Sequence, residues 1–154
     1  MKILIIEDDK NKLKQVTSFL RKIYINTEII ERYSYNSGIR ELLTGSRFDL
    51  LLLDMSMPTF DITSVESGGR PKPFAGKEIL RKLKKKRIQL PTIVITQFER
   101  FGDVENTISL EELNQELIDN FSESYIATVY YNSSQDNWKN ELKTYIVNEE
   151  LLNE

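Results

Sequence analysis

Four consecutive leucines, residues 50–53, constrain the fold more than any other part of the sequence. A strand built from them has no polar face, so it must be covered on both sides, as the strands of parallel sheets are. The run ends on Asp54, and open α/β sheets place their ligands at the carboxyl ends of such strands. The stretch therefore predicts a buried central strand that delivers a carboxylate to the ligand-binding edge, although strand ends also carry acids that only start turns.

The other apolar patterns alternate between strands and helices along the chain. Short strands are predicted at residues 3–6, 27–31, 91–96 and 125–131, besides the leucine strand. Helical spacing predicts helices at residues 10–23, 39–43, 76–83, 110–121 and 138–146. This β-α order predicts an α/β fold, a doubly wound five-stranded parallel sheet with helices on both faces. Counting strands along the chain, the expected order is 2-1-3-4-5.

The ends of several helices carry recognisable signals. Asp8 or Asp9 is suited to cap the first helix, and Gly45 is suited to terminate the second. The pair Ser133–Ser134 is predicted to cap the last helix, and residues 97–106 are predicted to form a polar loop. These signals fix where the predicted elements begin and end.

The length of 154 residues predicts one domain spanning residues 1–154. Residues 59–75 form a long connection with no helical or alternating pattern, and with two glycines and two prolines. Connections of this length are usually functional or mobile, although a tolerated surface insertion is equally compatible.

Composition excludes several classes of chemistry. The chain has no His and no Cys, which removes imidazole bases, His-bound zinc, Ser-His triads, disulfides and thiolate chemistry. A net charge of -3 gives no sign of nucleic-acid binding. The apolar run at residues 3–6 is too short for a signal peptide, and no stretch approaches a membrane span. We therefore expect a cytoplasmic protein that does not bind membranes or nucleic acid.

The predicted strand order brings several oxygen-bearing side chains to one edge of the sheet. Glu7, Asp8 and Asp9 follow the first strand, Asp54 follows the third, and Thr96 ends the fourth. Acids packed this closely repel one another unless a cation or a proton is present. Oxygen ligands without His or Cys favour Mg²⁺, and a carboxylate beside such an ion can attack phosphorus. Taken singly, the acids could be helix caps and Thr96 a hydroxyl bonded to backbone.

Four motifs, in chain order, carry a resemblance to a known family. They are Ile3-Leu4-Ile5-Ile6-Glu7-Asp8-Asp9, Leu51-Leu52-Leu53-Asp54-Met55-Ser56-Met57-Pro58, Gly76 with its helix, and Ile93-Val94-Ile95-Thr96. With them the chain resembles the receiver domain of two-component response regulators, which has a flavodoxin-like fold. The resemblance covers most of the chain.

The resemblance implies a role for each matched residue. Asp54 would be the phosphoacceptor and Thr96 the switch hydroxyl. Mg²⁺ would be held by Glu7, Asp8, Asp54 and the backbone carbonyl of Ser56, with Asp9 lying just beyond this set.

The resemblance also implies partners. A histidine kinase or phosphotransfer protein would supply the phosphoryl group. A downstream protein, or a second copy of the chain in a homodimer, would dock on the helix at 110–121, the strand at 125–131 and the last helix.

The chain departs from the family pattern at two site positions, and its connections after the third strand and between the fourth and fifth strands are longer than usual. Family members carry a Lys near the end of the fifth strand, but this chain has no Lys between Lys86 and Lys139, and Thr128 or Tyr130 stands there. The residue after the switch Thr is usually small, whereas Gln97 could narrow the pocket or hydrogen-bond Asp54. Three cations from the long connection and the start of the next helix are candidates to replace the missing Lys: Arg70, Lys72 and Lys77.

Two hypotheses follow for the function. The chain is either a receiver that is phosphorylated on Asp54 and signals by docking, or a receiver-like interaction module in which phosphorylation is weak or lost. A third reading, a Mg²⁺-dependent phosphatase or phosphotransferase, expects a second acid two residues after the nucleophile, where this chain has Ser56. We therefore expect a signalling domain and not an enzyme.

Overall fold

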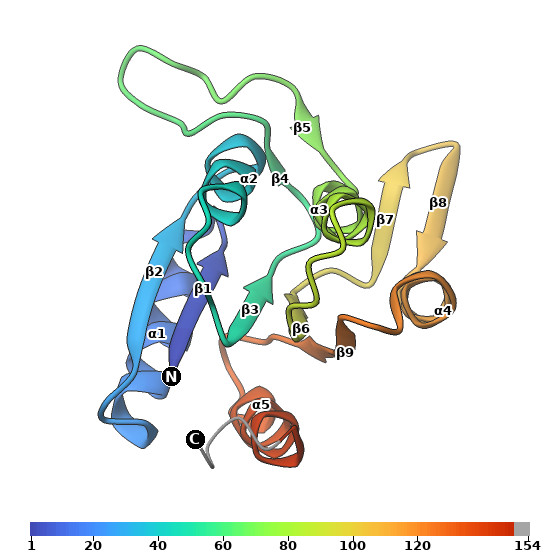
Figure 1. Ribbon diagram of the computed structural model, residues 1–154. Coiled ribbons are helices and arrows are strands. Elements are labelled where there is room, and N and C mark those ends of the chain that lie inside the picture. The colour runs from blue at the N-terminus through green and yellow to red at the C-terminus, as the bar shows by residue number, and fades with distance from the viewer. Residues whose placement is uncertain (150–154) are drawn as a thin grey trace.

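The computed structural model describes residues 1–149, and residues 150–154 of the predicted domain lie outside the described part (Figure 1). The helices are α1 Lys10–Ile23, α2 Tyr35–Leu43, α3 Ala75–Lys85, α4 Leu110–Phe121 and α5 Asn137–Asn148. The strands are β1 Lys2–Ile6, β2 Glu28–Arg32, β3 Leu50–Leu53, β4 Met57–Pro58, β5 Pro71–Lys72, β6 Thr92–Thr96, β7 Arg100–Asp103, β8 Asn106–Ser109 and β9 Tyr125–Tyr130.

The main sheet is parallel and has five strands in the order β2-β1-β3-β6-β9. Counted along the chain without the two short ribbons, this is the predicted order 2-1-3-4-5, so the predicted fold is confirmed. The register pairs Ile6 with Leu53 and Thr96 with Tyr130, so these strands end at the same edge. Residues that directly follow β1 and β3 therefore meet there.

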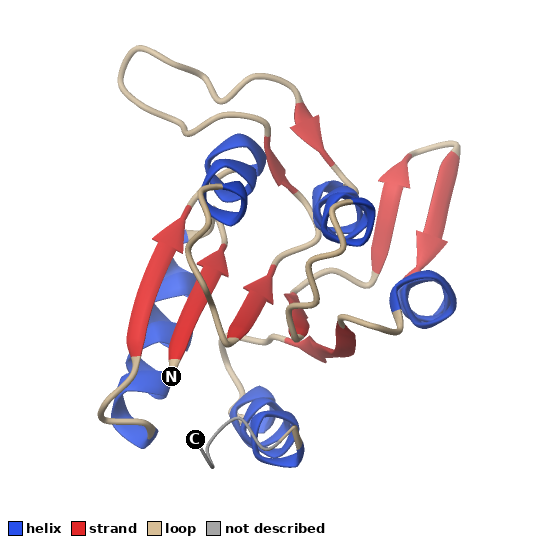
Figure 2. Ribbon diagram, viewed as in Figure 1, coloured by secondary structure: helices blue, strands red, loops and turns tan. Residues whose placement is uncertain are grey.

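The leucine strand β3 divides the core into two layers. Leu51 and Leu53 face α2, α3 and α4, whereas Leu50 and Leu52 face α1 and α5. All four leucines are at most 1% exposed, because each strand face is covered by helices (Figure 2). Each buried leucine side chain contributes on the order of 2 kcal/mol to the free energy of unfolding.

The structure confirms two of the predicted helix-end signals and contradicts the third. Asp9 caps α1 by accepting from the backbone N–H groups of Asn11 and Lys12, and Gly45 follows α2 with φ of 86°. The predicted cap of α5 is wrong, because that helix begins at Asn137. Ser134 donates instead to the side-chain oxygen of Asn132, so it is held in a turn before the helix.

Two short antiparallel ribbons extend from the main sheet. Strands β4 and β5 pair at the two ends of the connection 59–70, which reaches outward beyond α2 (Figure 1). The predicted polar loop at 97–106 is partly wrong, because β7 and β8 form a hairpin there. Phe101 of this hairpin is buried opposite Ile108, whereas most of its other residues are polar, so the hairpin lacks a clear alternating pattern.

Among residues 1–149, no helix is both long enough and apolar enough to cross a membrane.

Candidate functional site

Three acids meet at the carboxyl edge of the central strands. Glu7 and Asp8 directly follow β1, and Asp54 directly follows β3. Each residue contributes one carboxylate oxygen to a group of three that lie within 4.8 Å of one another. The sequence therefore placed these three acids correctly, and their oxygens are spaced as ligands of one cation would be.

The position of Asp54 is fixed by the backbone around it. Its amide N–H donates to the carbonyl of Ile6 at 3.1 Å, and its Oδ1 accepts from the N–H of Met55 at 2.8 Å. The start of helix α3 packs closely against the same backbone. A Cβ added to Gly76 would lie only 2.6 Å from the carbonyl oxygen of Asp54. Glycine at this position lets the start of α3 approach the acid, which is only 5% exposed.

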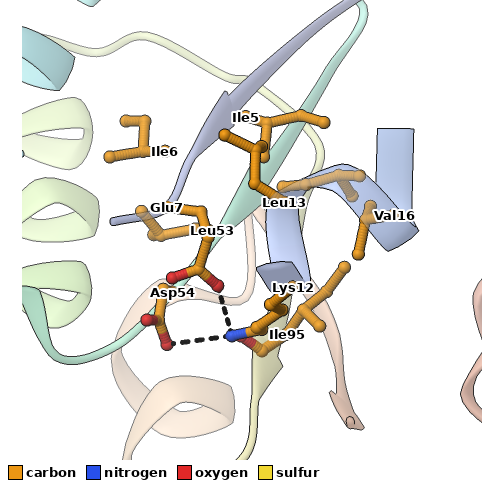
Figure 3. A pocket seen from close by; sticks show the side chains of 10 residues that line it. Ile5, Ile6, Glu7, Lys12, Leu13, Val16, Leu53, Asp54 and Ile95 are labelled. Carbon is orange, nitrogen blue, oxygen red and sulfur yellow. Dashed lines mark hydrogen bonds and ion pairs between the residues drawn. The ribbon is translucent and has the colours of Figure 1, made fainter. Parts of the chain in front are cut away.

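A buried lysine lies among the acids, and the sequence analysis missed it. Lys12 of α1 is 2% exposed, and its Nζ contacts a carboxyl oxygen of Glu7 and forms an ion pair with Asp54, at 3.4 Å from Asp54 Oδ1 (Figure 3). Nζ also donates to the backbone carbonyl of Ile95 at 2.7 Å. The available signal was the position of Lys12 beside Leu13 on the inward face of α1, where a charge is unusual.

The electrostatics of the cluster follow from burial and close charges. Burial and the charge of Asp54 raise the pKa of Glu7 to about 9, although Lys12 opposes this shift. Burial and Asp54 also raise the pKa of Asp8. Burial alone would lower the pKa of Lys12, but Asp54 and Glu7 outweigh it, so its pKa is raised and the ammonium stays charged. The cluster thus favours states with less negative charge.

A cavity of about 300 Å³ opens above the acids. Asp8, Asp54, Ser56 and Gln97 line it, together with residues from the connection that follows β4. Predicted hydrogen bonding of Gln97 to Asp54 is not seen, because its Nε2 donates to Asp9 Oδ2 at 3.4 Å. Gln97 therefore lies at the cavity wall, as expected for a bulky side chain.

The predicted switch hydroxyl lies on the neighbouring strand. Thr96 ends β6 and is completely buried, and its Oγ1 accepts from the N–H of Phe98 at 3.1 Å. In this hydrogen bond the Thr96 hydroxyl is the acceptor, so its own proton remains available for donation to another group.

The residues at the expected place of the family Lys do not enter the acid cluster. Thr128 shares a hydrogen bond of 2.6 Å with the hydroxyl of Tyr125, and Tyr130 is 39% exposed. The next residue, Tyr131, is buried and its ring centroid lies 6.0 Å from Lys12 Nζ. The candidate replacements Lys72 and Lys77 form ion pairs with glutamates of α3 and α4, so neither is engaged with Asp54.

Similar proteins show the family to which the chain belongs. No family model matches the chain. The chain is 30% identical over 143 residues to the Detocs response regulatory protein DtcB of Enterobacter cloacae (strain JD6301), and the match covers 92% of this chain and 95% of that protein. The chain belongs to the response regulator receiver family. This confirms the family that the motifs predicted.

Solved receiver domains share the fold at lower identity. The signal receiver domain of a Luxo repressor protein from Vibrio parahaemolyticus has a TM-score of 0.63 and 16% identity, over 99% of this chain and 94% of that chain. The response regulator TrrA from Thermotoga maritima, solved with Mg²⁺ and BeF, has a TM-score of 0.57 and 19% identity, over 94% and 97% of the two chains. Receiver domains are signalling modules and not typical enzymes, so this receiver is placed in phosphorelay signalling at the level of its family.

Proposed function

We propose that this receiver accepts a phosphoryl group on Asp54, with Mg²⁺ bound, and signals by docking to another protein. The observation that carries the proposal is the meeting of Asp54, Glu7 and Asp8, whose oxygens lie within 4.8 Å of one another below an open cavity. The proposal treats residues 1–154 as one receiver-like domain, with the connection 59–75 as an insertion beside the cavity.

The candidate ligands fit Mg²⁺, because every ligand atom that a side chain supplies is a carboxylate oxygen. Glu7, Asp8, Asp54 and the backbone carbonyl of Ser56 would hold the ion. When bound, Mg²⁺ neutralises charge on phosphoryl oxygens. The Mg²⁺ complex of TrrA, a neighbour in fold, supports this assignment.

The transfer step is a displacement at phosphorus by the carboxylate of Asp54. An oxygen of Asp54 forms the new O–P bond while the P–N bond of a phosphohistidine breaks, and the imidazole nitrogen keeps the electron pair. The contacts of Asp54 to the Met55 N–H and to Lys12 are both on Oδ1, so Oδ2 is the oxygen that we assign to the attack. Thr96 would then donate its hydroxyl proton to a phosphoryl oxygen.

The partners follow from the same step. A histidine kinase or a phosphotransfer protein would supply the phosphoryl group. Docking of the downstream protein would use α4, β9 and α5, where Ile118 and Tyr130 are exposed. This face would also serve a homodimer, which sedimentation with and without beryllofluoride would detect.

Acetyl phosphate and beryllofluoride test the proposal directly. With Mg²⁺ and acetyl phosphate, the wild-type protein gains the mass of one phosphoryl group, and beryllofluoride shifts the amide resonances of residues 54 and 96. Asp54→Asn abolishes both responses, and the control Asp119→Asn, at an exposed position of α4, keeps them. A wild-type protein that behaves like Asp54→Asn under every donor would refute the proposal.

A second candidate function is a receiver-like interaction module with weak or no phosphorylation. The observation that favours it is Gln97, which lines the cavity and donates to Asp9 where the family usually has a small residue. Gln97→Ala separates the two functions. A gain of phosphorylation in this variant over an inert wild type supports the interaction module.

A further inference from the structure

Lys12 carries a buried positive charge at a place where helix geometry disfavours one. The residue lies in the first turn of α1, and the helix dipole opposes a cation there. Burial of an ammonium group adds a further cost unless the group is paired. The contacts of Nζ with Glu7, Asp54 and the carbonyl of Ile95 offset both costs, and the ring of Tyr131 adds a cation–π contact.

These contacts hold the ammonium group beside Asp54. An ammonium has three N–H donors, and Lys12 has three acceptors arranged around it. Lys12 and two of the acids, Glu7 and Asp54, line a small cavity together with apolar residues of β1, α1, β3 and β6 (Figure 3). These apolar residues are Ile5, Ile6, Leu13, Val16, Leu52, Leu53 and Ile95.

The position of Lys12 supplies what β9 lacks. The chain has no Lys between Lys86 and Lys139, so β9 cannot present one to Asp54. At the end of β9 the buried ring of Tyr131 lies instead over Lys12, with 6.0 Å from Nζ to the ring centroid. Within residues 1–149, Lys12 is the cation that forms an ion pair with Asp54.

We propose that Lys12 is the cation that pairs with the phosphoryl group on Asp54, supplied from α1 instead of from the end of β9. The inference rests on the proposed function, because it assigns a contact to the phosphorylated state. Nζ lies 3.4 Å from Asp54 Oδ1, so a small rotation of the Lys12 side chain brings it to a phosphoryl oxygen bonded to Asp54. The contacts to Glu7 and Ile95 hold the group while this exchange occurs.

The same contact has an opposite effect on metal binding. A positive charge beside Glu7 and Asp54 repels Mg²⁺ from those oxygens. Removal of the charge therefore weakens stabilisation of the phosphoryl group but strengthens the binding of Mg²⁺. A residue that served only the packing of α1 would not separate the two properties in this way.

The test compares Lys12→Met with Lys14→Met, a matched change at an exposed lysine of the same helix. With Mg²⁺ and acetyl phosphate, Lys12→Met is expected to lower the rate of phosphorylation about 10²-fold, as the loss of one preorganised donor does in other sites. By calorimetry without a phosphoryl donor, Lys12→Met is expected to bind Mg²⁺ about tenfold more tightly. Lys14→Met changes neither quantity.

Each result decides between supporting and overturning the inference. A wild-type rate in Lys12→Met overturns the role of Lys12 and leaves Asp54 as phosphoacceptor. A parallel fall in rate and in Mg²⁺ affinity also overturns it, since that result indicates a structural residue. A wild type that no donor phosphorylates overturns the proposed function together with this inference. If Lys12→Met does not fold, Lys12→Gln, which keeps a donor but removes the charge, is judged by the same two measurements.

Discussion

Gly76→Ala probes how closely helix α3 holds the backbone of Asp54. The added Cβ would lie 2.6 Å from the Asp54 carbonyl oxygen and 3.1 Å from Met55 Cα, whereas ordinary contacts begin at 3.4 Å. Both neighbours are backbone atoms, so no side-chain rotation relieves the clash, and α3 and the loop after β3 must separate. Overpacking of this kind costs about 1–3 kcal/mol. The higher helix propensity of alanine offsets only a small part of this cost, because the roughly 1 kcal/mol difference applies to a helix interior and Gly76 lies in the first turn of α3.

We therefore expect Gly76→Ala to lower the free energy of unfolding by about 1–2 kcal/mol, measured by urea denaturation. Displacement of the acid is expected to slow phosphorylation by acetyl phosphate by up to about 10²-fold. The control is Gly45→Ala, because Gly45 has φ of +86° with no atom within 4 Å of the added Cβ. That variant is expected to lose about 1–2 kcal/mol through backbone strain while keeping the wild-type rate.

Two results would refute this reasoning about Gly76. A Gly76→Ala protein as stable as wild type would show that the start of α3 shifts freely. A destabilised Gly76→Ala protein with the wild-type phosphorylation rate would show that the helix contact does not position the carboxylate.

Three further predictions concern the site and the core. The pKa of Glu7 is raised to about 9 in the metal-free protein, so the folded state keeps a proton that the unfolded chain has released. Thermal denaturation in EDTA should then show stability falling as pH rises from about 5 to 9, by at most about 1.4 kcal/mol per pH unit, and Glu7→Gln should flatten this slope. Leu52→Ala empties a fully buried position and should cost about 2–5 kcal/mol in urea denaturation; a loss below 1 kcal/mol would contradict the two-layer core. Asp9→Ala removes the N-cap of α1 and should cost about 1 kcal/mol, whereas Asp9→Ser should retain most of it.

The sequence predicts those parts of the fold in which a residue pattern strongly restricts the possible arrangements. Four leucines in a row need cover on both faces, which helices on the two sides of a parallel sheet provide, and this pattern predicted the central position of β3. The strand order then brought Glu7 and Asp54 together without further information, since acids that directly follow adjacent parallel strands share an edge.

Lys12 escaped prediction because a charge near the start of a helix usually points to solvent. Its burial depends on acceptors from three other segments, the end of β1, the end of β3 and the carbonyl of Ile95, and no local pattern reports them. The β7–β8 hairpin was missed for a similar reason. Phe101 is the one buried residue of the hairpin, so the pairing of β7 with β8 depends on backbone hydrogen bonds. Such bonds do not require a particular pattern of side chains, so the sequence does not reveal them.

The aromatic packing around Trp138 has a practical consequence. Trp138 is the single tryptophan of the chain, and its ring lies 5.5 Å from that of Phe19 in α1 and 5.2 Å from that of Tyr131. Tyr131 in turn faces Lys12, so the indole is separated from the acid cluster by two side chains. We therefore expect the fluorescence of Trp138 to report rearrangements at the acid cluster in real time. A stopped-flow experiment on the unlabelled protein needs no added dye.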